Sequence, residues 1–447
     1  MAMASGSGCS ASSTTCSRRP ATNAYFPLLI PESFLHKEAQ HVEGFAPEAA
    51  VVTHGGGKKL DEPLIIRPTS ETIIYTMFAK WVQSYRDLPI LMNQWANVVR
   101  WEMRTRLFLR TTEFLWQEGH TAHVTHDEAE EEARRMLGVY RDFMEGWIAM
   151  PVVTGQKTDS ERFAGALRTY SCEAMMQDNK ALQAGTSHNL GQNFSRAFDL
   201  KFQSESGSTE FAWNTSWGVS TRMVGGMVMT HGDDVGLRVP PLLAPIELVI
   251  VPIYRSDVER SLVLEAAERV RHSLCEWDRR ESSRLRVHID ARDGMKPGAK
   301  YYEWELRGIP LRLEIGPRDL ANNQGVLVRR DTREKRPVSL DVLGEDVSET
   351  LSRMQRDMLA VALERREANS VRERISYDRF RQFMDAEGGF VYSGWCGDPA
   401  CEAQIEDDTK ATIRCLPDEE FRSAEAPTTC LRCDRAATSE AMWAKSY

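Results

Sequence analysis

The sequence predicts an α+β protein with more than one domain, and its length and two element patterns lead to this prediction. The chain has 447 residues, which at about 150 residues per domain indicates roughly three domains. Up to about residue 240, strand-like runs separated by short loops accompany long helical segments, which is typical of an antiparallel sheet with helices. Beyond residue 245, strands and helices alternate, as in a small α/β domain. A hydrophobic content of 42% is sufficient for sizeable cores.

The first large unit is expected at 23–240, after a leader at 1–22 rich in Ser, Thr and Ala. Two strand-like runs on either side of an arginine-bearing loop predict an antiparallel hairpin. A helix after Thr125 is favoured by the acids in its first turns, which complement the helix dipole. Gly55–Gly57 lacks the spacing of a phosphate-binding loop, so it predicts a flexible turn. The expected elements are the run Tyr25–Pro31, the helices Ser70–Tyr85 and His126–Met150, and the strands Val98–Met103, Thr111–Glu118 and Ser216–Met229.

Two further units are expected after the proline-rich linker Leu237–Pro245. The unit at 245–345 is predicted to be α/β, and the unit at 347–447 begins with a helix at Ser348–Arg374 and ends in a cysteine cluster. The elements expected in the α/β unit are the strands Ile246–Ile253, Leu285–Ile289, Leu311–Ile315 and Gly325–Val328, and the helices Ser256–Trp277 and Lys300–Arg307.

Five of the nine cysteines lie between residues 396 and 433. Two close pairs, Cys396 with Cys401 and Cys430 with Cys433, supply four thiolates, the set that suits tetrahedral Zn²⁺. No histidine is nearby and four thiolates fill the shell, so this zinc would be structural. Four free surface cysteines are the alternative. Cys415 lies alone in an apolar alternating stretch, so we expect it to be packed in a core.

Compartment and solubility follow from the same composition. No secretory segment precedes the cysteines, which favours a reducing compartment and hence the cytoplasm. The acid-poor leader with Arg18 and Arg19 resembles a transit peptide weakly, and a disordered tail is the favoured interpretation. No run approaches the roughly 18 apolar residues of a membrane span, so no membrane segment is expected.

Charge is distributed unevenly along the chain. The formal net charge is −9, which excludes a uniformly basic surface. Between Arg279 and Arg336, however, fifteen Lys and Arg stand against nine Asp and Glu. With Tyr301, Tyr302 and Trp304 nearby, this excess would suit single-stranded RNA. A solvated helix and sheet surface is the alternative.

The hairpin between Asn97 and His120 mixes arginines and acids with aromatic residues. Guanidinium groups on neighbouring strands would line a cleft floor, and their planar charged fork suits polyphosphate. From the residues alone, a salt-bridged sheet surface is an equal alternative.

Several segments together resemble prolyl-tRNA synthetases of the archaeal/eukaryotic type, which are class II aminoacyl-tRNA synthetases. The resemblance covers about residues 23–447. The segments similar to the second and third class II motifs are Arg100–Glu102 with Phe108–Thr111 and Glu113, and Gly218–Arg222 with Thr230–Asp234. Those similar to signatures of the proline enzymes are Arg67–Thr72, Phe114–Thr121, Thr158–Ala166, Gln183–His188 and Lys300–Asp319.

The resemblance implies ATP-dependent activation of L-proline and its transfer to the 3′ end of tRNA(Pro). It assigns 23–240 to a class II catalytic domain with an antiparallel sheet, 245–345 to an anticodon-binding domain and 347–447 to a zinc-bearing C-terminal α/β domain. Mg²⁺ would bridge the ATP phosphates. The chain would act as a homodimer, and the tail ending at Tyr447 resembles the family's tail, which reaches the catalytic domain.

Residue roles are implied by the same resemblance. Arg100 and Arg222 would be the catalytic residues, because both would hold phosphates. The ATP site would comprise Arg100, Glu102, Arg110, Thr111, Gln183, Thr186, Ser220 and Arg222. The proline site would comprise Thr69, Glu71, Arg100, Trp116, Glu118, Phe163 and His188. Glu305, Arg312, Arg318 and Asp319 would read anticodon guanines.

One feature departs from the family pattern. Members carry a long helix before the segment equivalent to Tyr25–Pro31, and it belongs to the dimer interface; residues 1–22 do not resemble that helix. The alternative function is therefore a catalytically impaired, synthetase-derived RNA-binding or regulatory protein. A class II enzyme for another amino acid would need a pocket different from Thr69, Glu71 and His188.

Overall fold

The computed structural model describes residues 21–34, 49–276 and 284–447. The described residues form two compact units. The larger unit contains the described residues up to Phe143, together with Pro151–Gly226 and Arg366–Tyr447. The smaller unit contains Met144–Met150 and the described residues of Met227–Arg365. Residues 1–20 of the leader and the segments 35–48 and 277–283 lie outside the description.

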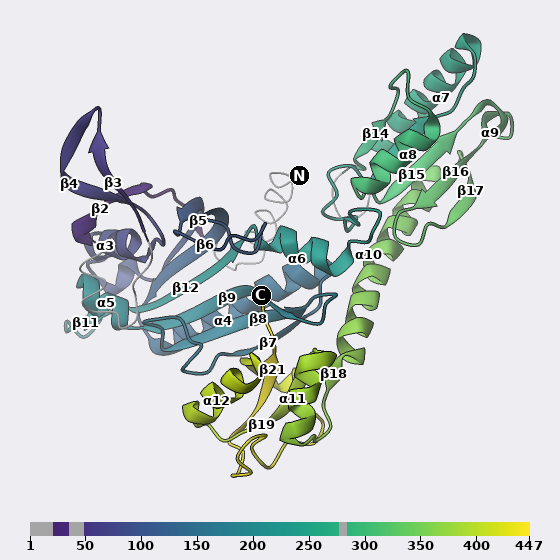
Figure 1. The fold of residues 1–447 in the computed structure, drawn as a ribbon. Coiled ribbons are helices and arrows are strands. Elements are labelled where there is room, and N and C mark those ends of the chain that lie inside the picture. The colour runs from purple at the N-terminus through teal and green to yellow at the C-terminus, as the bar shows by residue number, and fades with distance from the viewer. Residues whose placement is uncertain (1–20, 35–48, 277–283) are drawn as a thin grey trace. The chain divides into compact units, whose positions relative to one another are not determined.

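A mixed, mostly antiparallel sheet of eleven described strands forms the frame of the larger unit (Figure 1). Its edges are short strands that pair in parallel with their neighbours, and its centre is antiparallel throughout. In spatial order the strands are β1 (Thr22–Asn23), β5 (Ile90–Val99), β6 (Glu113–His123), β12 (Trp213–Ser220), β9 (Ala181–Gly191), β8 (Arg168–Met175), β7 (Val152–Gln156), β20 (Thr412–Pro417), β21 (Ser439–Ala444), β19 (Phe390–Trp395) and β18 (Ser370–Val371).

The predicted arginine hairpin is confirmed, with different bounds. β5 and β6 pair antiparallel and end with Val99 opposite Glu113. The predicted strand Val98–Met103 is therefore wrong in position, because β5 lies mostly before it and residues 100–103 belong to the loop. The alternation of apolar and polar residues inside β5 was too weak to indicate a strand of this length.

The predicted strand Ser216–Met229 is wrong in its second half. β12 ends at Ser220, and α6 (Arg222–His231) follows. A short apolar run such as Met223–Met229 fits a strand or a buried helix equally well, so periodicity alone could not separate the two.

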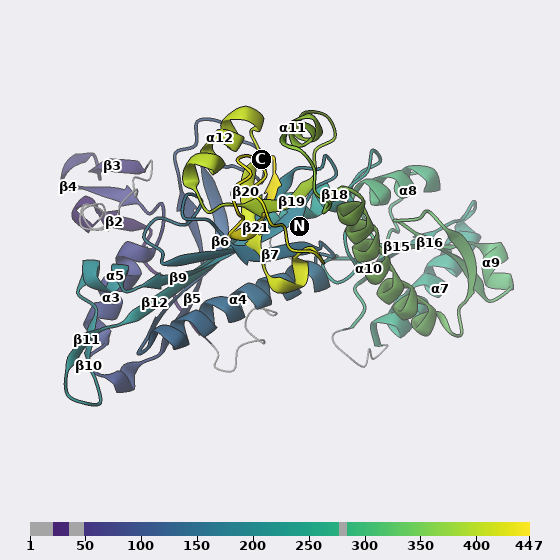
Figure 2. The ribbon, with the colours of Figure 1, turned by 90° about the horizontal axis from the view of Figure 1, so that it is seen from below.

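Helices cover the sheet of the larger unit. α4 (His126–Gly146) lies along one face of the sheet (Figure 2), where the Ser187 hydroxyl donates to Ala133 O at 2.7 Å and the Tyr140 hydroxyl to Gln117 Oε1 at 2.6 Å. The predicted start of this helix is confirmed, since Thr125 Oγ1 accepts from the Glu128 amide at 3.2 Å. The other helical elements of this unit are α3 (Glu71–Trp81), η1 (Tyr85–Asp87), α5 (Asn193–Phe198), α11 (Tyr377–Ala386), α12 (Pro399–Thr409) and η2 (Glu419–Phe421).

The C-terminal segment continues the sheet of the N-terminal half. β20 pairs antiparallel with β7, with Leu416 opposite Gln156 and Pro417 opposite Gly155. Only glycine fits at position 155, because a Cβ there would lie 2.3 Å from Leu416 O. The two segments, more than 200 residues apart, therefore share one rigid frame.

Two small sheets complete the larger unit. The three-stranded sheet has the order β2 (Leu29–Pro31), β4 (Lys58–Ile66), β3 (Ala50–Gly55), and β10 (Lys201–Gln203) pairs with β11 (Thr209–Phe211). Gly56 and Gly57 form the predicted turn, and both have positive φ.

The smaller unit contains a five-stranded mixed sheet between helices, as the α/β prediction requires. Leu248, Ile250, Leu311 and Leu313 form its core with Val263 of α7 and Leu351 of α10. The strand order is β14 (Val287–Ile289), β13 (Leu248–Pro252), β15 (Leu311–Ile315), β16 (Gln324–Arg329), β17 (Lys335–Ser339), and the helices are α7 (Asp257–Glu276), α8 (Pro297–Leu306), α9 (Pro317–Ala321) and α10 (Leu343–Ala368). The last helix begins five residues before its predicted start and ends before Arg374.

Among the described residues, no helix has the length and apolar character that crossing a membrane requires.

Candidate active site

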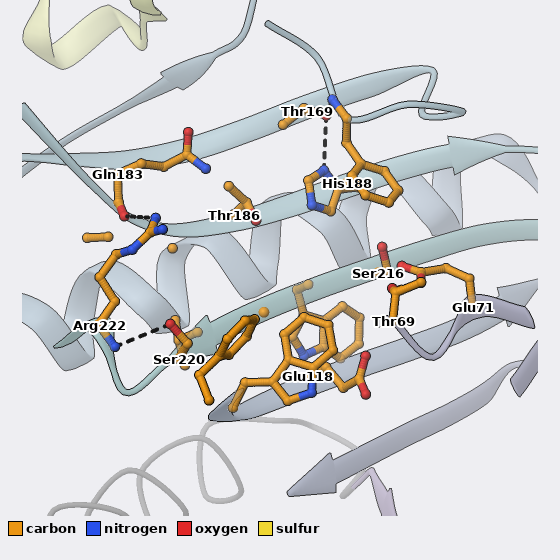
Figure 3. Close-up of a pocket in the computed structure, with 18 of the residues that line it drawn as sticks. Thr69, Glu71, Glu118, Thr169, Gln183, Thr186, His188, Ser216, Ser220 and Arg222 are labelled. Carbon is orange, nitrogen blue, oxygen red and sulfur yellow. Dashed lines mark hydrogen bonds between the residues drawn. The ribbon is translucent and has the colours of Figure 1, made fainter. Parts of the chain in front are cut away.

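The main cavity of the larger unit lies on the sheet face opposite α4. Gln117 and Ser187 contact α4, and because successive residues of a strand face opposite sides, Trp116, Glu118 and His188 lie on the other face. The cavity has a volume of about 260 Å³. Figure 3 shows Glu71 and Thr69 near one end, and Arg222 with Gln183 near the other.

The first end of the cavity is acidic and buried. Glu118, 1% exposed, accepts from the Ser70 hydroxyl at 2.5 Å, from Gln94 Nε2 at 2.6 Å and from His120 Nε2 at 2.9 Å. The Thr69 hydroxyl donates to Glu71, the first residue of α3. Ser70 is the N-cap residue of α3, but its hydroxyl donates to Glu118 and makes no side-chain cap hydrogen bond with the helix. Two buried carboxylates at this end would stabilise a bound cation.

His188 lies above this acidic end and is neutral. Its Nδ1 is hydrogen-bonded to Thr169 Oγ1 at 3.0 Å (Figure 3). Its ring lies 4.7 Å from the Phe163 ring, centroid to centroid. Burial, and to a smaller extent the nearby His120, lower the pKa of His188 to about 3. Burial also acts to lower the pKa of His120, but the hydrogen bond and charge of Glu118 raise it overall. The cavity therefore keeps His188 as an uncharged hydrogen-bonding group.

The opposite end of the cavity is cationic. Arg222, the first residue of α6, donates from Nε to Leu109 O at 3.2 Å and from Nη1 to Gln183 O at 3.4 Å. Its pKa is lowered because the group is withdrawn from water, and because Arg110 and Arg100 lie near it. Arg100, which donates from Nε to Pro68 O at 3.0 Å, lies between the two ends of the cavity, since burial lowers its pKa while Glu71 and Glu118 act to raise it. Cations that approach one another in this way favour an anion between them.

A second cavity of about 320 Å³ adjoins the first, because Glu161, Gln183 and Arg222 line both. Arg110 lines only the second cavity. Tyr447, whose hydroxyl donates to Asp178, also lines it, so the C-terminal tail does reach this part of the larger unit.

The structure brings together most of the residues predicted for the two substrates. The predicted residues that line the main cavity are Thr69, Glu71, Arg100, Trp116, Glu118, Phe163, Gln183, Thr186, His188, Ser220 and Arg222. Glu102 and Thr111 line neither cavity: Glu102 accepts from the Arg104 amide at 2.8 Å, and the Thr111 hydroxyl donates to Glu113 O at 2.7 Å.

Other cavity residues were not singled out from the sequence. His120, Glu161 and Thr169 line the main cavity, and Arg414 lines the second. His120 and Glu161 lie inside segments that resemble the proline enzymes, and this resemblance was the signal that could have identified them. For Arg414 the sequence contained no such signal, because the approach of Arg414 to the second cavity depends on the pairing of β20 with β7.

The four predicted metal ligands form one cluster. The Sγ atoms of Cys396, Cys401, Cys430 and Cys433 all lie within 4.8 Å of one another. Arg435 donates to Cys433 Sγ at 3.2 Å and lowers the pKa of this thiol to about 6, whereas burial raises the pKa of Cys396 to about 12.

Cys415 is fully buried, in a core with Phe390 and Met442, and is not part of the cluster. The expectation that it is packed in a core is confirmed.

The residues predicted to read the anticodon are largely engaged within the smaller unit. Arg312, 6% exposed, is paired with Glu305 at 2.7 Å and with Glu314 at 3.0 Å. Asp319 caps α9 by accepting from the Gly316 amide at 2.9 Å, and Arg318 is exposed. Arg312 is thus used in internal ion pairs, whereas Arg318 remains exposed.

Three family models match the chain. A tRNA synthetase class II core domain (G, H, P, S and T) matches residues 54–231, an anticodon binding domain matches 247–350, and a prolyl-tRNA synthetase C-terminal domain matches 377–447.

Close relatives are proline--tRNA ligases from bacteria. The chain is 54% identical over 430 residues to that of Chlorobium phaeobacteroides (strain BS1), and 53% identical over 430 residues to that of Prosthecochloris aestuarii. Both alignments cover 95% of this chain and 87% of the relative. A crystal structure of prolyl-tRNA synthetase from Cryptosporidium parvum, complexed with halofuginone and AMPPNP, is similar with a TM-score of 0.92 and 38% identity, over 100% of this chain and 92% of that one.

Proposed function

Because the chain belongs to the prolyl-tRNA synthetase family of class II aminoacyl-tRNA synthetases, we propose that its two adjoining cavities bind L-proline and ATP and form prolyl-adenylate. The prolyl group is then passed to the 3′ end of tRNA(Pro). The observation that carries this assignment is the polarity of the main cavity, which has buried carboxylates at one end, Arg222 at the other and Arg100 between them. Those are the complements of an ammonium group and a polyphosphate.

The acidic end takes the proline. Glu71 and Thr69 receive the secondary ammonium group, and Glu118 adds negative charge behind them, held by Ser70 and Gln94. Trp116 and Phe163 wall the ring, where their apolar and π surfaces favour a small cation with a hydrocarbon body. Neutral His188 lies near the carboxylate of proline. Because His188 carries no charge, it does not neutralise this carboxylate.

The cationic end takes the ATP. Arg100 holds the α-phosphate and the proline carboxylate, and Arg222 holds the γ-phosphate, with Ser220, Gln183 and Thr186 around the nucleotide. The carboxylate oxygen of proline forms a bond to the α-phosphorus as the bond to the bridging oxygen breaks, and pyrophosphate leaves. Positioning and charge stabilisation supply most of such catalysis.

The remaining ATP contacts rest on the family resemblance. Glu102, Arg110 and Thr111 belong to the arginine loop, where Arg110 already faces the second cavity. Mg²⁺ would neutralise the phosphates through hard oxygen ligands, and Glu161, shared by both cavities, offers such an oxygen from this chain.

In the transfer step, a hydroxyl of the terminal adenosine of tRNA attacks the prolyl carbonyl carbon, and AMP leaves with the mixed-anhydride oxygen. Glu305, Arg312, Arg318 and Asp319 are the proposed anticodon readers of the smaller unit. Of these, Arg318 is exposed and so is available to a base edge without breaking an ion pair.

The cysteine cluster binds a structural Zn²⁺. Four thiolates within 4.8 Å of one another fit a closed tetrahedral shell, which leaves no open position for a substrate.

The organisation of the chain completes the proposal. We assign 1–22 to a leader, 23–240 to the catalytic domain, 245–345 to the anticodon-binding domain and 347–447 to the C-terminal domain, in a cytoplasmic homodimer. The archaeal/eukaryotic type is supported by the match of the C-terminal model and by the likeness to the Cryptosporidium structure over the whole chain. A regulatory protein without activity has no support from the cavity, whose arginines and carboxylates are all in place.

The test is exchange of labelled pyrophosphate into ATP by purified full-length protein with Mg²⁺. Exchange should depend on proline, and alanine and cysteine should support far less. Exchange that is absent with proline while tRNA still binds, or that is greater with alanine or cysteine, would contradict the proposal. Sedimentation in the same buffer tests the dimer.

A further inference from the structure

Glu402 links the helix that carries Cys401 to the wall of the main cavity. It lies in the first turn of α12, directly after Cys401, and is 4% exposed. Its Oε1 accepts from the Thr158 hydroxyl at 2.8 Å and its Oε2 from the Ser160 hydroxyl at 3.1 Å. These partners lie more than 240 residues earlier in the sequence.

No cation among the residues that the structure describes pairs with Glu402, and burial raises the pKa of its carboxyl group. A buried carboxylate without a cation is costly, and the two hydroxyl donors offset only part of the cost. A neutral side chain of similar size would serve packing better at this position. The placement of a carboxylate here therefore indicates a task other than stability.

The partners of Glu402 begin a segment, 157–167, that joins β7 to β8 and lines the main cavity. Glu161 and Phe163 of this segment both face the cavity. The half of the segment that leads into β8 is held by two hydrogen bonds. The Phe163 amide donates to Thr169 Oγ1 at 3.0 Å, and Asn193 Nδ2 donates to Gly165 O at 2.9 Å. The half that follows β7 is held because the hydroxyls of Thr158 and Ser160 donate to Glu402.

We propose that Glu402 is a positioning residue for amino-acid recognition, an inference that rests on the proposed function. Glu402 fixes segment 157–167 so that Phe163 lies against His188 and closes the proline end of the cavity. The anchor of Glu402 is α12. Asp398 caps this helix by accepting from the Ala400 amide at 2.9 Å, and Arg435 pairs with Asp398 at 2.6 Å while also contacting the cysteines. The cysteine cluster thus holds the helix from which Glu402 reaches the cavity wall.

The substitutions Glu402→Ala and Glu402→Gln test the proposal in the full-length protein. Loss of two charge-assisted hydrogen bonds in Glu402→Ala should raise the KM for proline by about tenfold or more. Glu402→Gln keeps one acceptor oxygen and should give a smaller rise. The KM for ATP should rise less than the KM for proline, because Arg222 and Gln183 have other anchors and only Glu161 of the segment lies on the ATP side. Asp407→Ala, on the exposed side of the same helix, is the matched control and should resemble wild type.

A second measurement does not depend on catalysis. Amide hydrogen exchange of residues 158–166 should be faster in Glu402→Ala than in wild type and in Asp407→Ala, with an unchanged zinc content. Thr158→Val with Ser160→Ala should reproduce the effect, and adding Glu402→Ala to that pair should cost little more, because the same contacts have already been lost.

Three results would overturn the proposal. They are unchanged amide exchange in Glu402→Ala, equal rises of the KM values for proline and ATP, and loss of zinc together with the faster exchange. If wild type does not activate proline, the proposed function fails, while the amide exchange still decides whether Glu402 fixes the segment.

Discussion

Arg414 and Glu173 form a buried ion pair that joins the C-terminal segment to the N-terminal half of the larger unit. Arg414 Nε on β20 lies 3.1 Å from Glu173 Oε2 on β8, and their side chains are 7% and 0% exposed. Lys157 Nζ lies 2.9 Å from the other oxygen of Glu173. One carboxylate thus receives two cations, Lys157 from the N-terminal half and Arg414 from the C-terminal segment.

Arg414→Met should lower the free energy of unfolding by about 3 kcal/mol, because it leaves a buried carboxylate with one cation instead of two. The measurement is urea-induced unfolding followed by tryptophan fluorescence. Arg379→Met is the control: it breaks an exposed pair with Glu387 and should cost less than about 1 kcal/mol. In the double variant Arg414→Met with Glu173→Gln, the loss in the free energy of unfolding should be smaller than the sum of the losses in the two single variants. Full additivity would show that the two residues are not coupled.

Burial of neutral His188 should make stability depend on pH below neutrality. Its pKa is lowered from 6.5 to about 3, first by burial. Between these values the unfolded chain binds a proton that the folded chain does not, so stability is complete above pH 6.5 and falls as the pH decreases towards 3. His188→Gln should reduce this slope by about one proton. The ring signals of His188 in a proton NMR titration give a direct check, and a midpoint near 6.5 would refute the prediction.

Arg222→Lys should impair ATP use although it keeps the positive charge. A lysine cannot donate to Leu109 O and Gln183 O while presenting a planar fork to a phosphate. We expect kcat/KM for ATP in pyrophosphate exchange to fall by about 100-fold, with the KM for proline changed far less. Arg196→Lys, at an exposed position of α5, provides the control for the same chemical change. Equal losses for both substrates would argue against a phosphate-specific role.

Glu71→Gln should weaken proline binding selectively. It removes the charge that would receive the ammonium group but keeps an acceptor for the Thr69 hydroxyl. A charge-assisted bond to a buried group is worth about 1.5–3 kcal/mol, so the dissociation constant for proline should rise by about 10- to 100-fold. Calorimetric titration with proline measures it. A variant that binds proline as wild type does would place the ammonium group elsewhere.

Removal of the metal from the cysteine cluster should loosen the C-terminal part of the larger unit. The purified protein, kept under reducing conditions, should contain about one zinc per chain. Chelation, or Cys401→Ser, should lower the thermal unfolding temperature and speed amide exchange in α12, since the thiolates would then repel one another. Cys415→Ser, outside the cluster, should leave the zinc content unchanged. Zinc at well below one per chain in wild type would refute the assignment of the cluster.

Local signals in the sequence were sufficient for the elements and for most of the site. The helix after Thr125, the hairpin around the arginine loop and the alternating strands of the smaller unit all follow from caps and periodicity over short distances. The cavity residues Thr69, Glu71, Gln183, Thr186 and His188 were found because they lie in short segments that resemble motifs of the family, and not from composition or spacing. The second half of Ser216–Met229 was misassigned, since a short apolar run has no period of its own.

The sequence by itself determined the short-range elements, the paired cysteines and the segments whose family resemblance predicted the substrate residues. Only the tertiary structure decided that β20 joins β7, that Arg414 reaches Glu173, and that Glu402 holds Thr158 and Ser160. The physical reason is distance along the chain. Caps, turns and periodicity act over a few residues, whereas these contacts join positions more than 240 residues apart and arise only when two strands share an edge and exclude water between them.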